Sequence, residues 1–254
     1  MDLVEYRKSK QERHFWELAR IRFIKLLLKR YISITTPMDA ADIGCGDCYA
    51  VSELMLFLPF RKIWAKDPFL KDPLLSELRT RFPQIIFDNT ATGSDLSLMP
   101  RSDICFMLDV LEHIEQDHEF LVSVNRRLNE NGILLVTVPA YNFLFSDHDV
   151  FLKHYRRYNK KELCRQLSDA SFTVLGSGYF FFSLVLIRFL QKVFHVKDRN
   201  DIGKDSIPVF NSLLAGFLLL DARIGFFLNR IGIRLPGLSC WAVAAKNKSA
   251  ESGS

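Results

Sequence analysis

Several features are missing from this 254-residue sequence, and each absence excludes a class of protein. The five cysteines are odd in number and scattered, which argues against a disulfide framework and favours a reducing, cytoplasmic setting. The N-terminus is charged through Arg13 and lacks an apolar segment followed by a cleavage site, so no secretory signal is expected. The longest uncharged apolar runs, 177–187 and 206–220, are too short to span a bilayer.

Concentrated basic charge is also missing. A net charge of +5 is mild, and no Asn/Asp-Pro-Pro-Tyr box follows residues 102–108, so no nucleic-acid partner is expected. Cys45 and Cys48 form a C-x-x-C without a second ligand pair at metal spacing, so no metal site is expected. The sequence is rich in apolar residues, which make up 48% of it and include 22 Phe. They are enough for the core of a single domain over 1–254.

The most informative stretch is Asp42-Ile43-Gly44-Cys45-Gly46-Asp47-Cys48. It lies between a short apolar segment at 40–43 and a predicted helix at 49–57. Glycine has no Cβ, so the backbone N–H groups of such a turn can approach a ligand closely. The Gly-x-Gly-x-x-Gly fingerprint of dinucleotide sites is absent. The stretch nevertheless predicts the first strand-to-helix turn of a nucleotide-binding α/β unit.

Apolar runs alternate with helical periodicity through the rest of the chain. This alternation predicts an α/β fold with seven strands. Strands are expected at 40–43, 62–66, 84–87, 102–108, 133–139, 172–179 and 239–246, and helices at 14–32, 49–57, 71–82, 120–128 and from 159 onward, with a turn at 129–132.

Two segments carry a resemblance to a known family. Asp42 to Asp47 resembles motif I of class I S-adenosylmethionine (SAM) methyltransferases, with Cys48 in place of the third glycine. Asp109-Val110-Leu111-Glu112-His113-Ile114 resembles the Asp/Asn-x-Leu-x-His segment that in many members passes beside the methionine end of SAM. The resemblance covers about 14–178 and 237–246. It implies a doubly wound, seven-stranded, Rossmann-like sheet and a SAM-dependent methyltransferase that releases S-adenosyl-L-homocysteine.

Acidic residues after two predicted strands are candidates for binding the nucleoside. Asp67 lies 21 positions after Gly46 and is placed to accept hydrogen bonds from ribose hydroxyls, or else only to open a turn before Pro68. The resemblance implies an acidic partner for adenine, either Asp88 or Asp95, although Asp95 could be only a turn residue. The cofactor-binding residues predicted in this way are Asp42, Gly44, Cys45, Gly46, Asp67, Pro68, Asp88, Asp95, Asp109 and Val110.

The segment after residue 139 is dense in polar and aromatic side chains and is the expected acceptor side. It resembles a bacterial subgroup with a His-Tyr-Arg-Arg-Tyr box, often linked to cell-surface glycan assembly. His148 with Asp149 is the favoured base and orienter; His154 is a second candidate base, and His113 either is catalytic or orders its loop. The candidate catalytic residues are therefore His113, His148, Asp149 and His154.

Arginines in this segment have two interpretations. Arg156 and Arg157 could bind a phosphate or carboxylate through their guanidinium forks, or they could tie the loop to nearby helices together with Tyr158. With Tyr141 they form the predicted substrate-binding set of Tyr141, Arg156, Arg157 and Tyr158.

Two helical regions lie outside the predicted core at 38–178 and 237–246. The helix within 14–33 either packs as an ordinary amphipathic helix, or caps the cofactor through His14 to Trp16 and Arg20, or lies on a membrane. The apolar insertion at 179–236 either packs on the core or a second subunit, or forms a lid or peripheral membrane patch for a lipid-linked substrate.

The sequence thus predicts methyl transfer to a small-molecule or lipid- or glycan-linked acceptor, with a role in polysaccharide assembly. Two alternatives stay open: a quinone or lipid methyltransferase, and a non-catalytic SAM-binding partner of a membrane-associated assembly. Neither the acceptor nor the oligomeric state follows from the residues.

Overall fold

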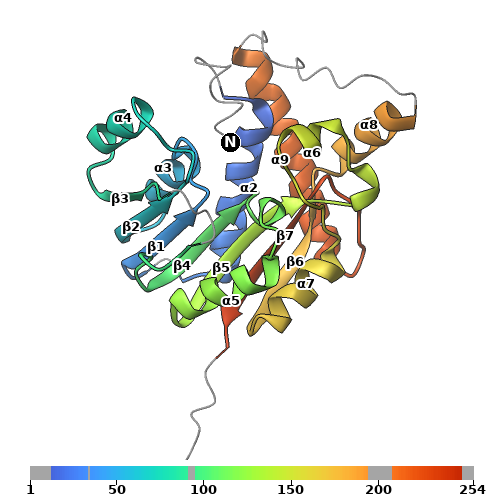
Figure 1. Ribbon diagram of the computed structural model, residues 1–254. Coiled ribbons are helices and arrows are strands. Elements are labelled where there is room, and N and C mark those ends of the chain that lie inside the picture. The colour runs from blue at the N-terminus through green and yellow to red at the C-terminus, as the bar shows by residue number, and fades with distance from the viewer. Residues whose placement is uncertain (1–12, 34, 91–94, 194–207, 248–254) are drawn as a thin grey trace, which may run out of the picture.

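Seven strands form one mixed sheet in this computed structural model, which describes residues 13–33, 35–90, 95–193 and 208–247 (Figure 1). The order is β3-β2-β1-β4-β5-β7-β6, with the first five strands parallel and β7 antiparallel to both neighbours. This confirms the predicted doubly wound sheet. The strands are β1 Met38–Ile43, β2 Phe60–Lys66, β3 Ile85–Asp88, β4 Ser102–Leu108, β5 Leu128–Pro139, β6 Phe172–Phe180 and β7 Ser239–Lys246.

Helices cover both faces of the sheet because strand side chains alternate between the faces. In β4, Phe106 belongs to the core beneath one helical layer, and Cys105 and Met107 belong to the core beneath the other. The first layer holds α2 Phe15–Tyr31, α3 Tyr49–Met55, α4 Leu74–Arg81 and α9 Pro208–Arg230, and the second holds α5 Asp117–Arg127 and α7 Lys160–Asp169 (Figure 1).

Some boundaries differ from the predicted ones. The turn expected at 129–132 lies inside β5, where Asn131 has a φ of +60° and the register against β4 shifts after Ser102. The irregular backbone lets Leu128 pair with Ser102 before regular pairing resumes, so the turn residues become part of the strand. Helix α7 begins where expected because the Asn159 side chain accepts a hydrogen bond of 2.9 Å from the Glu162 N–H.

Helix α2 packs on the domain as one of the predicted alternatives requires. Ala19, Phe23 and Leu27 are fully buried, and α2 lies beside α9 (Figure 1). The Phe23 ring stacks on Phe180 of β6 with the centroids 5.0 Å apart. Burial of these side chains fixes α2 across the sheet, next to the end where the glycine turn lies.

The predicted apolar insertion contains α8 Phe182–Val193 and α9, and its residues 194–207 lie outside the described part of the chain. One face of α9 is buried through Ala215, Leu218 and Ala222. The expectation that no segment could cross a bilayer needs correction, because Asn211–Arg230 is long and apolar enough by length and composition. That segment contains Asp221 and Arg223, and Asp221 ends the uncharged run at 206–220. In the most apolar window of the segment, 33% of the residues are buried.

Candidate active site

The glycine turn follows β1 and has a backbone that glycine makes possible. Gly44 and Gly46 have φ of +72° and +54°. A Cβ on Gly44 would lie 2.4 Å from Cγ2 of Val110, so no larger residue fits unless the Val110 side chain shifts. The Gly44 N–H donates to the carbonyl of Lys66 at 2.7 Å, which ties the turn to the end of β2.

Cys48 stands where the family pattern has its third glycine, and it keeps the conformation of that glycine. It is the residue before α3 and has a φ of +61°, in the left-handed region. The shape of the turn is therefore preserved at a cost of about 1–3 kcal/mol. A hydrogen bond with Cys48, and then burial, raise the pKa of the Cys45 thiol, which disfavours the thiolate needed for redox or metal chemistry.

Asp67 faces the turn from the end of β2. Its Oδ2 accepts a hydrogen bond of 2.9 Å from the Gly46 N–H, and its Oδ1 accepts one of 2.9 Å from the Phe69 N–H. The second bond is the turn-opening role considered for the residue before Pro68. The first places the carboxylate at the glycine turn, and ribose binding by Asp67 stays a prediction.

The two candidates for adenine recognition differ in their surroundings. Asp88 is buried, and its Oδ2 accepts a hydrogen bond of 3.1 Å from Nζ of the fully buried Lys66. Burial acts to raise the pKa of Asp88, but hydrogen bonds from Thr90 and Lys66 bring it below its usual value. Asp95 is exposed and accepts a bond of 2.8 Å from the Ser97 N–H, as a turn residue does. Neither assignment to adenine is tested by these contacts.

A pocket opens beside the turn, lined by Asp42, Gly44 and Leu108 of the sheet side and by Glu17 and Arg20 of α2. Helix α2 therefore contributes to the pocket as well as packing on the core. The Arg20 guanidinium forms an ion pair with Asp109, whose Oδ1 also accepts a bond of 2.9 Å from the Thr137 hydroxyl. Although burial opposes it, the charge of Arg20 lowers the pKa of Asp109 below its usual value.

Two buried polar atoms belong to residues that line this pocket. Oδ2 of Asp42 and Nε of Arg20 have no hydrogen-bond partner among the residues that the structure describes. Burial raises the pKa of Asp42 to about 7. Unpaired buried polar atoms are unfavourable, so a ligand with a donor for the carboxyl group and an acceptor for the guanidinium would complement both.

The acceptor-side segment is organised around the fully buried Asp149 in α6 Asp147–Phe151. Its Oδ1 lies 2.8 Å from Nδ1 of His154, and Arg157 donates Nε–H to Oδ1 at 2.8 Å and Nη2–H to Oδ2 at 2.9 Å. Burial acts to raise the pKa of Asp149, but the bonds from His154 and Arg157 lower it well below its usual value. The structure thus shows Asp149 orienting His154; the base role predicted for His148, also in α6, stays a prediction.

The His-Tyr-Arg-Arg-Tyr box ties the segment to the domain. Arg156 donates to the Glu115 carbonyl at 2.6 Å and lies 3.1 Å from a carboxylate oxygen of Asp117. The Tyr158 hydroxyl donates to the same carboxylate at 2.7 Å, and the Tyr141 N–H donates to the Tyr158 carbonyl at 2.9 Å. These bonds match the alternative in which the box staples its loop, while phosphate binding by the arginines stays a prediction.

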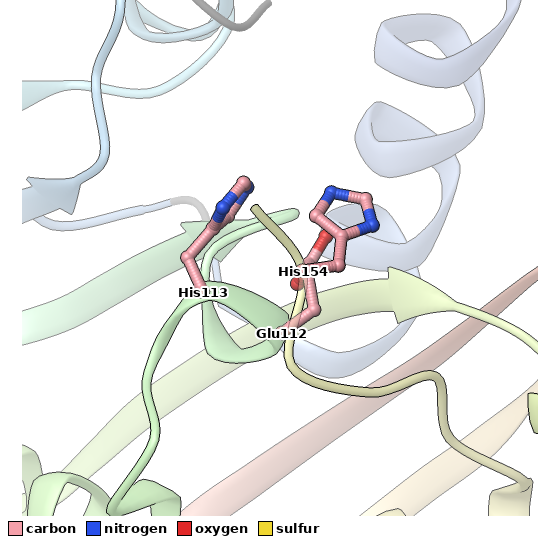
Figure 2. Close-up of side chains that lie close together, drawn as sticks. All are labelled: Glu112, His113 and His154. Atoms are coloured by element: carbon pink, nitrogen blue, oxygen red, sulfur yellow. The ribbon is translucent and has the colours of Figure 1, made fainter. Parts of the chain in front are cut away.

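Glu112 was not among the residues predicted to act in the site. It is fully buried in η1 Leu111–His113, just after β4, and neither of its carboxylate oxygens has a hydrogen-bond partner in the described ranges. Burial, followed by the charge of Asp109, raises the pKa of Glu112 well above its usual value. The rings of His113 and His154 meet edge to face above it, with centroids 4.6 Å apart (Figure 2). The signal in the sequence was a carboxylate between the apolar residues Leu111 and Ile114.

The fold and this site define a class of protein: a doubly wound domain with a pocket at the carboxyl ends of β1 and β4, where the strand order reverses. A methyltransferase-domain family model matches residues 13–176. The chain belongs to that family. The match confirms the family and agrees with the SAM-dependent class of enzyme inferred from the two motif segments. Membership of the bacterial subgroup with the His-Tyr-Arg-Arg-Tyr box stays a prediction.

Similar proteins agree with this assignment. A protein described as a probable S-adenosylmethionine-dependent methyltransferase, in two strains of Mycobacterium tuberculosis, is 25% identical over 151 residues, which cover 58% of this chain and 53% of the relative. The chain thus spans about half the length of the curated relatives it matches.

Solved structures show the same fold. The 1,6-didemethyltoxoflavin-N1-methyltransferase of Burkholderia thailandensis, solved with S-adenosylhomocysteine, has a TM-score of 0.55 at 17% identity, covering 92% of this chain and 81% of that one. The [4+2]-cyclase SpnF has a TM-score of 0.56 at 14% identity, covering 94% and 85%. At such identities the likeness shows the fold alone, and the same fold serves more than one chemistry.

Proposed function

We propose that this protein transfers the methyl group of SAM to a small-molecule acceptor. The observation that carries the proposal is the pocket beside the glycine turn, where the carboxyl group of Asp42 and the guanidinium of Arg20 each leave one buried atom unpaired. SAM has an ammonium group that can donate to the first and a carboxylate that can accept from the second. The residues present therefore fit the group that the family implies.

Each residue around the pocket then has a role. Asp67, already bonded to the Gly46 N–H, would accept from the ribose hydroxyls, and Asp109 would hold Arg20 in place through their ion pair. SAM supplies an electrophilic sulfonium methyl group when bound. The protein's contribution is to hold donor and acceptor in line, which is the main source of rate in such transfers. His154, oriented by Asp149, is the candidate to take a proton from an acceptor hydroxyl.

Calorimetric titration with SAM and with S-adenosylhomocysteine tests the cofactor part. We expect binding by the native protein and a loss of at least tenfold in affinity in Asp67→Ala. Asp169→Ala, which removes an exposed carboxylate at the end of α7, is the matched control and should bind as the native protein does. Absence of binding to the native protein would refute the proposal. Binding without turnover of any acceptor would favour the non-catalytic partner instead.

A second candidate function is methylation of a lipid-linked acceptor, including a glycan or quinone carrier, at a membrane surface. One observation favours it: α9 exposes an apolar stripe of Leu213, Phe217, Leu220, Ile224 and Phe227, spaced three or four residues apart along one side of the helix. Exposed Arg223 and Arg230 accompany the stripe, and cations beside an apolar helix face suit an anionic membrane.

Co-sedimentation with vesicles containing anionic lipid tests this candidate. We expect binding by the native protein and its loss in the double variant Phe217→Ser/Phe227→Ser. Leu56→Ser, which removes an apolar side chain that is 83% exposed and lies after α3, is the control and should leave binding unchanged. If native protein stays in the supernatant at low salt, the acceptor is a soluble molecule and the stripe has another partner.

A further inference from the structure

Three side chains with metal-binding chemistry meet beside the cofactor pocket. Glu112 and His113 come from η1 after β4, and His154 comes from the segment after α6. One donor atom of each lies within 4.8 Å of the others (Figure 2). The three residues come from two segments that are distant in sequence, so tertiary structure alone brings them together.

The Glu112 carboxylate is the observation that points to a ligand. It is fully buried, and both of its oxygens lack a hydrogen-bond partner among the described residues. Arg20 and Arg157 act on it electrostatically, but their guanidinium groups are paired with Asp109 and Asp149. A buried carboxylate without a partner is unfavourable, and a cation held between it and the two imidazoles would satisfy it.

His154 is held in the orientation that a metal ligand needs. Its Nδ1 is hydrogen-bonded to Asp149 at 2.8 Å, which places the proton on Nδ1 and leaves the lone pair on Nε2. Metal-binding histidines commonly have a carboxylate or carbonyl partner on the other ring nitrogen, which fixes the tautomer and makes the ligand more basic. Asp149 is itself fixed by two bonds from Arg157, so the whole arrangement is preorganised.

We propose that Glu112, His113 and His154 bind one divalent transition-metal ion of the Zn²⁺ type. Two imidazoles and a carboxylate are a ligand set used by catalytic zinc, whereas Mg²⁺ and Ca²⁺ prefer sites made of oxygen atoms. The remaining coordination position would accept an oxygen of the methyl acceptor. This proposal replaces the sequence-based expectation of no metal. In the metal-loaded protein it also replaces the base role of His154, because the Nε2 lone pair cannot bind a metal ion and accept a proton at once. Only the role of the metal in methyl transfer rests on the proposed function.

Equilibrium dialysis against Zn²⁺ with measurement of bound metal tests the site directly. We expect one equivalent bound by native protein and an affinity at least tenfold weaker in Glu112→Gln, which keeps the shape of the side chain. His113→Gln and His154→Gln should show the same loss, and they carry the test if the buried Glu112 variant does not fold. His118→Gln, which changes a histidine of α5 outside the cluster, is the matched control and should bind as the native protein does.

The cysteine pair near the cofactor turn is the competing zinc site. The double variant Cys45→Ser/Cys48→Ser should therefore keep its zinc. The proposal is overturned if the native protein binds none, or if the cysteine variant loses the metal while Glu112→Gln retains it. Folding of each variant is checked by circular dichroism in EDTA. Titration with S-adenosylhomocysteine in EDTA separates this proposal from the proposed function. The protein can bind zinc and fail to bind S-adenosylhomocysteine, or bind S-adenosylhomocysteine and fail to bind zinc.

Discussion

The cofactor side and the acceptor side of this protein are built in different ways. On the cofactor side, the Gly44–Cys48 turn is formed by left-handed backbone conformations and by N–H groups that bond the ends of β1 and β2 together. On the acceptor side, the buried carboxylate of Asp149 is paired with the half-buried Arg157, eight residues further along the chain. The cofactor side depends on residues that permit a left-handed backbone, while the acceptor side depends on each charged side chain having an oppositely charged partner. The two sides should therefore fail in different ways when they are mutated.

The largest effect is expected on the acceptor side, from Asp149→Asn. This change keeps the side-chain shape but leaves Arg157, whose side chain is only 11% exposed, without its carboxylate partner. Breaking a buried ion pair of this kind costs about 3–5 kcal/mol. We expect a correspondingly lower free energy of unfolding in urea.

The control for this change is Asp39→Asn, which removes the carboxylate from an ion pair with the 57%-exposed Arg61. Its urea midpoint should stay close to that of the native protein, because exposed ion pairs contribute little. Equal destabilisation by both variants would contradict the description of Asp149 as the centre of a buried network.

The next largest effect is expected on the cofactor side, from Gly44→Ala. The added Cβ would meet Val110 and would occupy a residue with φ of +72°. We expect destabilisation of about 1–3 kcal/mol from the strained backbone and the overlap together, with at least tenfold weaker binding of S-adenosylhomocysteine. Calorimetric titration and urea unfolding measure the two quantities.

Gly216→Ala is the matched control, since a Cβ there meets no heavy atom within 4 Å and the residue lies inside α9. It should stabilise the protein by about 0.5–1 kcal/mol, as alanine does in a helix interior. If Gly44→Ala were as well tolerated as this control, the close approach of the loop after β4 would not constrain the turn.

A pH effect on stability follows from Asp42. Its pKa is about 7 in the folded protein against a usual value of 3.8, so the folded state holds the proton more tightly than the unfolded state does. The free energy of unfolding should therefore fall as the pH rises from about 4 to about 7, by at most about 1.4 kcal/mol per pH unit. In urea unfolding at pH 5 and pH 7, Asp42→Asn should reduce the pH dependence of the free energy of unfolding. The dependence that remains comes from Glu112, which acts in the same direction. An unchanged slope would show that Asp42 is ionised in the folded protein.

The smallest effect is expected from Cys48→Gly. Glycine relieves the left-handed strain at this residue but loses the contacts of a fully buried thiol. The strain relieved, about 1–3 kcal/mol, and the burial lost, about 1–2 kcal/mol, oppose one another, so the net change in stability should be about 1 kcal/mol or less. Affinity for S-adenosylhomocysteine should be unchanged. A large gain in affinity would show that Cys48 distorts the turn.

The same contrast explains how much could be predicted. The order of the elements and the glycine turn were predicted because apolar periodicity and Gly-x-Gly spacing are local properties of the chain. The histidine that bonds to Asp149 was not predicted. Asp149 was expected to orient its neighbour His148, whereas its carboxylate in α6 bonds to His154. The apolar helix before the last strand was expected, but its capacity by length and composition to cross a bilayer was missed, because Asp221 and Arg223 interrupt the uncharged run.

The sequence by itself determined the seven-stranded fold, the turn at residues 44–48 and the family, because each depends on residues close together in the chain. Tertiary structure decided how Arg20 of α2 pairs with Asp109, and how Glu112 and His113 meet His154. Contacts between distant segments depend on how the sheet and its loops pack, and no spacing in the sequence records that geometry. Burial then decides the chemistry, because a carboxylate such as Glu112 becomes a candidate ligand only when water and hydrogen-bond donors are excluded from it.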